Sequence, residues 1–208
     1  GSKSASLSNC HGGLNDGYQG TRIAPIPMGG GSGDRALFMG GLIAPAKIDT
    51  IQDITISSTG NTNDFGNLLA AVYGGSAFGS ALRGINAAEV SEANTIEYKE
   101  FATKGNSIDF GDLTVARQGP GSVASSTRGI VGGGEVPGSR SNVMDYVEIG
   151  TLGNAADFGD LTVARSYLGG ASSTTRGVFA GGDVHPTPKN EIDYVTIAST
   201  GNATDFGN

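Results

Sequence analysis

A motif of eight residues, Gly-Asn-x-x-Asp-Phe-Gly-[Asp/Asn], occurs four times in this chain of 208 residues. The Asp of Asp-Phe-Gly in the four copies is Asp64, Asp109, Asp157 and Asp205, and successive copies lie 45, 48 and 48 residues apart. Nearly constant spacing is the signature of a repeat protein, in which each repeat is one structural unit that buries its faces against its neighbours. The chain is therefore expected to fold as a tandem array.

Other positions recur in step with this motif. An Arg precedes it in every copy, at Arg35, Arg128 and Arg176 and, three residues nearer, at Arg83. A column of mostly acidic residues, which includes Glu97, Asp145 and Asp193, stands twelve residues before the Asp. We interpret these two columns as ion pairs that fix the register of the repeats. The columns with a predicted structural role are Asp64, Phe65, Gly66, Asp109, Phe110, Gly111, Asp157, Phe158, Gly159, Asp205, Phe206, Gly207, Arg35, Arg128 and Arg176.

The local pattern within a repeat is typical of β-strands. Residues 191–198 are rich in β-branched and aromatic side chains, and the turn residues Gly and Asn follow them. No stretch shows helical apolar spacing with caps. We expect an all-β protein, a small β-propeller of four tandem four-stranded blades of about 48 residues each. The predicted domain is residues 1–208, with blades at about 5–66, 67–111, 112–159 and 160–208 and a glycine-rich insertion around Gly29–Gly33 in the first blade. In each motif, the Phe is expected to fill the contact between blades, and the Asp and Gly are expected to form a turn.

The columns resemble a kelch repeat. Gly181-Gly182, Tyr194, Phe206 and Arg165 stand in the kelch order, as do Gly133-Gly134, Tyr146, Phe158 and Arg117. Phe replaces the usual kelch Trp, and the near-identical segments Asp109–Arg117 and Asp157–Arg165 are similar to repeats of marine bacteriophage and cyanophage proteins. This resemblance implies a structural or attachment module of a virion, located on the virion or outside the cell. Its partners would be other virion proteins or a host cell-surface protein or glycan.

Kelch propellers usually have more than four blades, so three arrangements of the four repeats are compatible with the sequence. We favour a closed four-bladed ring, and the alternatives are a fragment of a longer protein or a homo-oligomer in which several chains close one ring.

Charge and motif content argue against several classes of function. A net charge of −7 argues against nucleic acid and anionic membranes, which both attract basic surfaces, and no stretch approaches the roughly 20 apolar residues of a membrane span. Asp-Phe-Gly resembles a kinase magnesium motif, yet it recurs in every repeat and no nucleotide loop accompanies it. The single Cys10 and the two histidines, His11 and His185, are too few for structural zinc. We expect a non-enzyme with no cofactor; calcium bound by the carboxylates is the alternative.

Recognition is expected to reside in loops. Residues 135–142 and 183–190 differ most between copies, and His185 is predicted to lie in an exposed loop. A lectin-like glycan-binding propeller is the first alternative function, with Tyr18, Tyr73 or Tyr167 as aromatic contact. A glycan-acting enzyme is the second, and it requires two carboxylates about 5–10 Å apart in a cleft.

Overall fold

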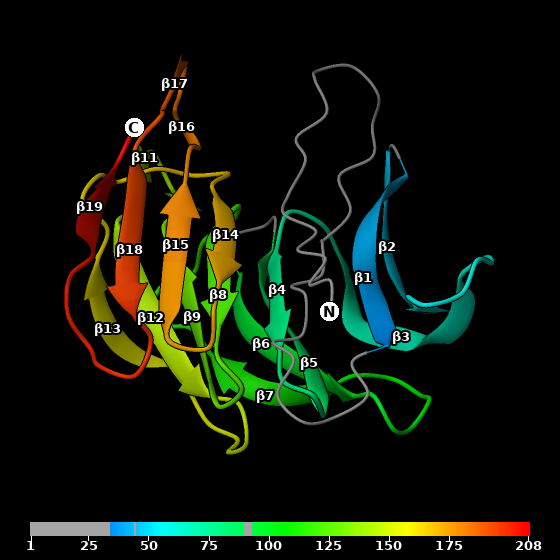
Figure 1. The fold of residues 1–208 in the computed structure, drawn as a ribbon. Coiled ribbons are helices and arrows are strands. Elements are labelled where there is room, and N and C mark those ends of the chain that lie inside the picture. Colours follow the sequence, from blue (N-terminus) through cyan, green and yellow to red (C-terminus); the bar gives the residue numbers. More distant parts are fainter. Residues whose placement is uncertain (1–33, 44, 90–92) are drawn as a thin grey trace.

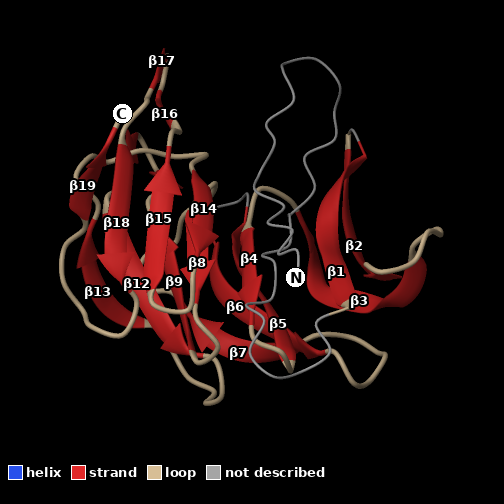
Figure 2. Cartoon of the chain, viewed as in Figure 1, coloured by secondary structure: helices blue, strands red, loops and turns tan. Residues whose placement is uncertain are grey.

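The computed structural model describes residues 34–43, 45–89 and 93–208, and all regular structure in these ranges is β-strand (Figures 1 and 2). The predicted all-β class is therefore confirmed. The expectations for Cys10, His11, Tyr18 and Gly29–Gly33 concern residues outside the described ranges.

The strands form four antiparallel sheets that follow one another along the chain. The first sheet contains β1 (Arg35–Ile43), β2 (Ala46–Thr55) and β3 (Asn63–Val72), and the second contains β4 (Ser76–Gly79), β5 (Arg83–Glu89), β6 (Ala93–Glu100) and β7 (Ile108–Asp112). The third contains β8 (Gly121–Ala124), β9 (Arg128–Gly132), β12 (Val143–Glu148) and β13 (Ala156–Asp160). The fourth contains β14 (Gly169–Ser172), β15 (Arg176–Ala180), β18 (Ile192–Thr196) and β19 (Thr204–Gly207). Neighbouring strands in each sheet are consecutive in the sequence, apart from one short hairpin inserted in each of the last two sheets.

These two inserted hairpins are β10 (Glu135–Val136) with β11 (Ser139–Arg140), and β16 (Asp183–Val184) with β17 (Thr187–Pro188). They occupy the segments that differ most between copies of the repeat. Figure 1 shows β16 and β17 projecting beyond the end of the fourth sheet.

The Asp-Phe-Gly motif lies inside the last strand of each sheet and forms a bulge. In the third sheet, Gly159 pairs with Met144 and Asp157 pairs with Asp145, so Phe158 is an extra residue without a partner. The second and fourth sheets show the same shift in register. The expected turn at the Asp and Gly is therefore wrong. Turns and bulges both use a Gly with positive φ, and here the bulge bends the last strand.

The hydrophobic core lies between the sheets rather than within any one of them. One cluster joins the second and third sheets and contains Phe78, Phe110 and Val147, and another joins the third and fourth and contains Phe158, Phe179 and Val195. A third cluster lies on the first sheet and is contacted by Phe101, which follows β6 of the second. Phe65, Phe110 and Phe158 are all buried, as predicted, whereas Phe206 of the last copy is exposed, contrary to the prediction, because no described sheet follows it.

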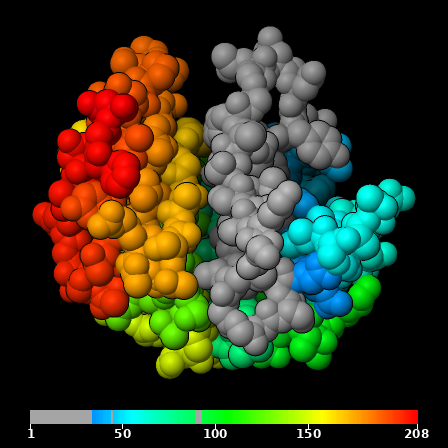
Figure 3. All heavy atoms as spheres, in the orientation of Figure 1, coloured from blue at the N-terminus to red at the C-terminus, as the bar shows by residue number. Residues whose placement is uncertain are grey.

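Figure 1 shows the four sheets side by side along an arc in chain order. The short strands β4, β8 and β14 contact one another in sequence on one side of this arc. In the space-filling view of Figure 3, the fourth sheet and the first sheet lie at opposite ends of the described part of the arc.

Candidate functional site

Each of two buried ion pairs joins the linker between two sheets to the later of those sheets. Arg117 Nη2 lies 2.9 Å from Asp145 Oδ2, and Arg165 Nη1 lies 2.9 Å from Asp193 Oδ2; all four side chains are fully buried. Each Arg follows the last strand of one sheet, and its partner lies on a strand of the next sheet. A buried charge is tolerated only when it is paired and hydrogen-bonded, so each pair holds the linker against the sheet that follows it.

The two pairs differ in how completely their polar atoms are satisfied. Arg165 also donates hydrogen bonds to the carbonyl oxygens of Gly181, Phe179 and Val163. Arg117 donates to the Val131 carbonyl, while its Nε and Nη1 atoms have no hydrogen-bond partner among the described residues. Desolvation lowers the pKa of Arg117, and the adjacent Asp145 carboxylate opposes this shift.

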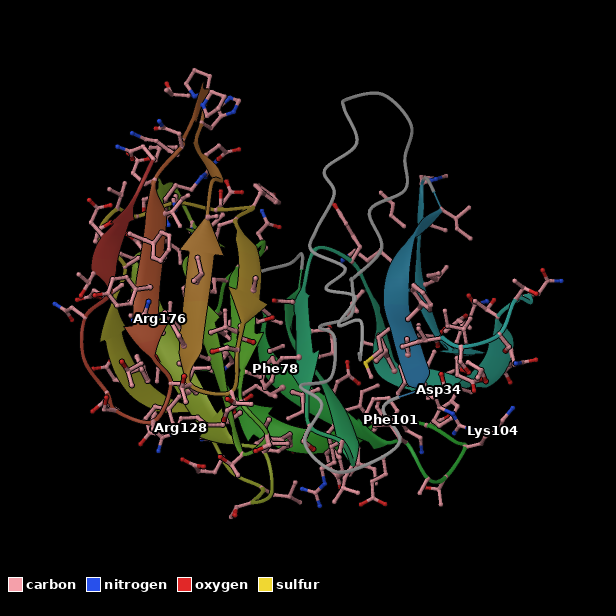
Figure 4. The ribbon with its side chains drawn as sticks, viewed as in Figure 1. Asp34, Phe78, Phe101, Lys104, Arg128 and Arg176 are labelled. Atoms are coloured by element: carbon pink, nitrogen blue, oxygen red, sulfur yellow. The ribbon has the colours of Figure 1, made fainter. Side chains whose placement is uncertain are left out.

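The predicted pairing of the acidic column with Arg128 and Arg176 is wrong. Asp145 and Asp193 pair with Arg117 and Arg165 instead. Arg128 bonds Glu148 at 2.6 Å, and the Arg176 guanidinium lies over the Tyr194 ring at 4.6 Å (Figure 4). The physical reason is position: Arg128 and Arg176 begin strands β9 and β15, opposite the ends of β12 and β18, whereas the acidic residues pair further along these strands.

The Arg column has a different structural role, which is to bond the following sheet. Arg35 Nη1 donates to the Phe101 carbonyl at 2.7 Å, and Arg83 Nη1 donates to the Ile149 carbonyl at 3.0 Å. Arg128 Nη1 donates to the carbonyls of Ile197 and Ala198 at 3.2 and 3.0 Å. Phe101, labelled in Figure 4, follows β6 of the second sheet and packs against the hydrophobic cluster of the first sheet.

The Gly-Asn half of the repeat motif bonds the Asp-Phe-Gly half of the preceding copy. We call this contact the seam, and it joins Phe65-Gly66 to Gly105-Asn106, Phe110-Gly111 to Gly153-Asn154, and Phe158-Gly159 to Gly201-Asn202. In each seam the Gly of the Gly-Asn pair donates its N–H to the Phe carbonyl, at 2.7, 2.9 and 2.7 Å. The side-chain oxygen of the Asn accepts a hydrogen bond from the N–H of the residue that follows the Phe-Gly pair, at 3.2, 3.1 and 3.1 Å.

The repeat columns are thus brought together at the seams, where they perform structural tasks. Each seam is a hydrogen-bonded contact between backbones, and the Gly of each Phe-Gly pair is required because the facing backbone approaches its α-carbon closely. A Cβ atom built on Gly159 would lie 2.5 Å from both the carbonyl carbon and the carbonyl oxygen of Gly201.

The polar cluster at the two hairpins is the strongest candidate for recognition. We call it the hairpin surface, and it comprises residues 135–140 and 183–188 together with Gln118 and Tyr167. Arg140 joins the two hairpins, because it bonds Glu135 at 2.6 Å and Asp183 at 3.4 Å. Glu135 also accepts hydrogen bonds from Gln118 at 3.0 Å and from the Tyr167 hydroxyl at 3.4 Å.

Two residues singled out in the sequence lie on this surface. His185 is exposed between β16 and β17, as predicted. Tyr167 is half-buried, and burial followed by the negative charge of Glu135 raises the pKa of its hydroxyl. Tyr73, another aromatic residue considered for glycan binding, lies instead at the first sheet's end, with the Lys47 ammonium 5.7 Å from its ring centre.

The parts of the chain that the structure describes hold no group of three or more His, Cys, Asp and Glu side chains arranged to bind one metal ion. They also contain no helix with the length and apolar character that crossing a membrane requires. Tyr146 and Tyr194 pack edge-on against Phe158 and Phe206 at 6.0 Å, an arrangement suited to packing between strands.

Neither the protein-family models nor the curated protein sequences contain a match to this chain. Its functional interpretation therefore rests on the geometry described above.

Proposed function

We propose that this chain is a non-enzymatic attachment or structural module whose sheets are the blades of a small propeller-like scaffold. Support comes from the contrast between the seams and the hairpin surface. The seams repeat the same contacts three times, whereas the two hairpins have different sequences and carry exposed side chains. A rigid frame with variable projecting segments is the usual arrangement of a binding module.

The hairpin surface offers a partner both apolar and polar contacts. Val184, His185 and Thr187 are exposed on the outer hairpin, while Arg140 and Glu135 hold the base of both hairpins in place. Side chains that are already fixed lose less conformational entropy on binding, which favours affinity. The proposed partner is a protein or glycan of a virion or of a host cell surface, as the resemblance to phage repeats implies.

A direct test is binding of the fluorescently labelled chain to a panel of marine cyanobacterial cells by flow cytometry. The variant Val184→Ser/His185→Ser changes only exposed hairpin side chains and is expected to weaken binding about tenfold or more. The control Leu82→Ser alters a 76% exposed side chain in the turn between β4 and β5, away from the hairpins, and is expected to bind like the original chain. Absence of binding across the panel, or equal binding by the hairpin variant, would refute the proposal.

A lectin-like function is the second candidate, and one observation favours it. Tyr167 presents a half-buried ring beside the polar groups of Gln118 and Glu135, and sugars bind to aromatic faces flanked by hydrogen-bonding groups. Periodate treatment of the cells, which destroys glycans, distinguishes the two cases. Loss of binding after periodate supports a glycan partner, and loss only after protease treatment supports a protein partner.

A further inference from the structure

The three internal seams use a fixed set of groups from each side. The preceding sheet supplies the Phe and Gly of its last strand. It also supplies the Arg that begins one of its inner strands, such as Arg128 at the start of β9. The following sheet supplies the Gly-Asn turn and a carbonyl acceptor such as that of Ile197. The two sides are different, so the seam is a heterologous contact that joins unlike faces.

The outer face of the fourth sheet carries the first set of groups without their counterparts. Phe206 is 55% exposed, whereas Phe158, which stands 48 residues earlier, is 2% exposed. A Cβ atom at Gly207 would meet no atom of the described residues within 4 Å. Arg176 is exposed and, among the described residues, donates no side-chain hydrogen bond to a following sheet, unlike Arg128.

The outer face of the first sheet carries the complementary set. A Cβ atom on Gly60 of its Gly-Asn turn would meet nothing within 4 Å in the described part of the chain. Ile56 is 53% exposed, and its counterpart in the fourth sheet, Ile197, is 1% exposed. Phe38 is 39% exposed, and its counterpart Phe179 is fully buried against the third sheet. The groups that a seam requires from the following sheet are therefore present and available here.

We propose that a second copy of this chain docks its first sheet onto the fourth sheet and forms an intermolecular seam. Gly60-Asn61 of one copy would bond Phe206-Gly207 of the other, and Arg176 would donate to the Ile56 carbonyl. This assignment continues the internal contacts, since each of these residues has the position in its repeat that makes the same bond in the three internal seams. It is independent of the binding function proposed for the hairpin surface.

A second copy fits this contact better than the chain's own first sheet does. Among the described residues, no hydrogen bond, ion pair or hydrophobic cluster joins the first sheet to the fourth. The two sheets lie at opposite ends of the arc, as Figures 1 and 3 both show. Within the described residues the two faces do not cover each other, and their complementary groups favour a second copy as the occupant of each.

Sedimentation velocity over a wide range of chain concentrations tests this proposal. We expect the mass of the original chain to rise with concentration. Phe206→Asp and Ile56→Asp, which each place a charge on one of the two faces, are expected to weaken association tenfold or more. Arg176→Glu provides a second change on the fourth-sheet face that leaves Phe206 intact. Leu82→Asp is the matched control, because it adds the same charge at an exposed apolar residue outside both faces, and it is expected to associate like the original chain.

Mixing the two face variants gives the sharpest result. Phe206→Asp retains an intact first sheet and Ile56→Asp retains an intact fourth sheet, so an equal mixture is expected to form dimers and no larger species. A monomeric mass at every concentration would overturn the proposal, because it would mean that the faces stay open or close within one chain. Association that survives both substitutions, or a mixture that stays monomeric while each variant remains folded by circular dichroism, would overturn it equally.

Discussion

Replacing Gly159 by Ala should destabilise the chain far more than the same replacement at Gly207. Both glycines occupy the same position in the motif and have nearly the same φ, +137° and +138°. A side chain at such a φ costs about 1–3 kcal/mol, and this term is common to both variants. At Gly159 the new Cβ atom would also lie 2.5 Å from the Gly201 carbonyl group, whereas at Gly207 it would meet nothing within 4 Å.

The close contact at Gly159 involves backbone atoms, which cannot rotate away as a flexible side chain does. Overpacking of this kind costs about 1–3 kcal/mol, so Gly159→Ala should lose about 2–6 kcal/mol in total and Gly207→Ala at most about 1–3 kcal/mol. The difference corresponds to about 2–12 °C in Tm for a chain of this size. Thermal unfolding followed by circular dichroism at low chain concentration, where copies do not associate, measures it. Equal Tm values for the two variants would refute the claim that the seam requires glycine because of close backbone approach.

Three further outcomes follow from the contacts between sheets. Asp193→Asn leaves the buried Arg165 without its charged partner and should cost about 3–5 kcal/mol in urea unfolding; an Arg165→Met/Asp193→Leu double variant should recover most of this loss, and a larger loss in the double variant would contradict the argument. Arg128→Ala, which removes bonds to Glu148 and to the fourth sheet, should lower the unfolding free energy by about 1.5–3 kcal/mol, while Arg176→Ala should change it by less than about 1 kcal/mol; similar losses would argue against the role of this column. Because the pKa of Tyr167 is raised in the folded chain, its stabilising contribution is complete below the unfolded value of 10.0 and is lost as the pH rises through the folded value; the stability of Tyr167→Phe should therefore fall less steeply above pH 10, and unchanged pH profiles would refute this.

The strand-like pattern within each repeat was sufficient to predict the all-β class, and the recurring Phe predicted part of the core. A single antiparallel sheet has two faces to cover, and the recurrence of one Phe per repeat indicated which residue would cover them. Phe65, Phe110 and Phe158 are buried for this reason. The propeller arrangement remains a proposal, because periodicity predicts that neighbours stack but carries no information on whether the ends meet.

The sequence did not resolve which charges pair. Two Arg columns and one mostly acidic column recur at the same spacing, so the period alone cannot choose between them. Arg117 and Arg165 were recognised only as members of the kelch-like order, and nothing in the residues beside them indicated that their side chains would be buried. The bulge at Phe158 was missed for a similar reason, because a Gly beside an Asp is equally typical of a turn and of a bulge.

Because the three seams use the same contacts, the gene for this chain can gain or lose a whole repeat and keep the hydrogen bonds of the seams. Recombination between the near-identical coding stretches for residues 109–117 and 157–165 would remove or add one repeat in frame. Loss of residues 112–159 would place Phe110-Gly111 next to Gly201-Asn202. The equivalent atoms of Phe110-Gly111 would then make the hydrogen bonds that Phe158-Gly159 now makes. A change in the number of repeats would therefore keep the hydrogen bonds of the seam, while core side chains of the newly joined sheets would meet for the first time.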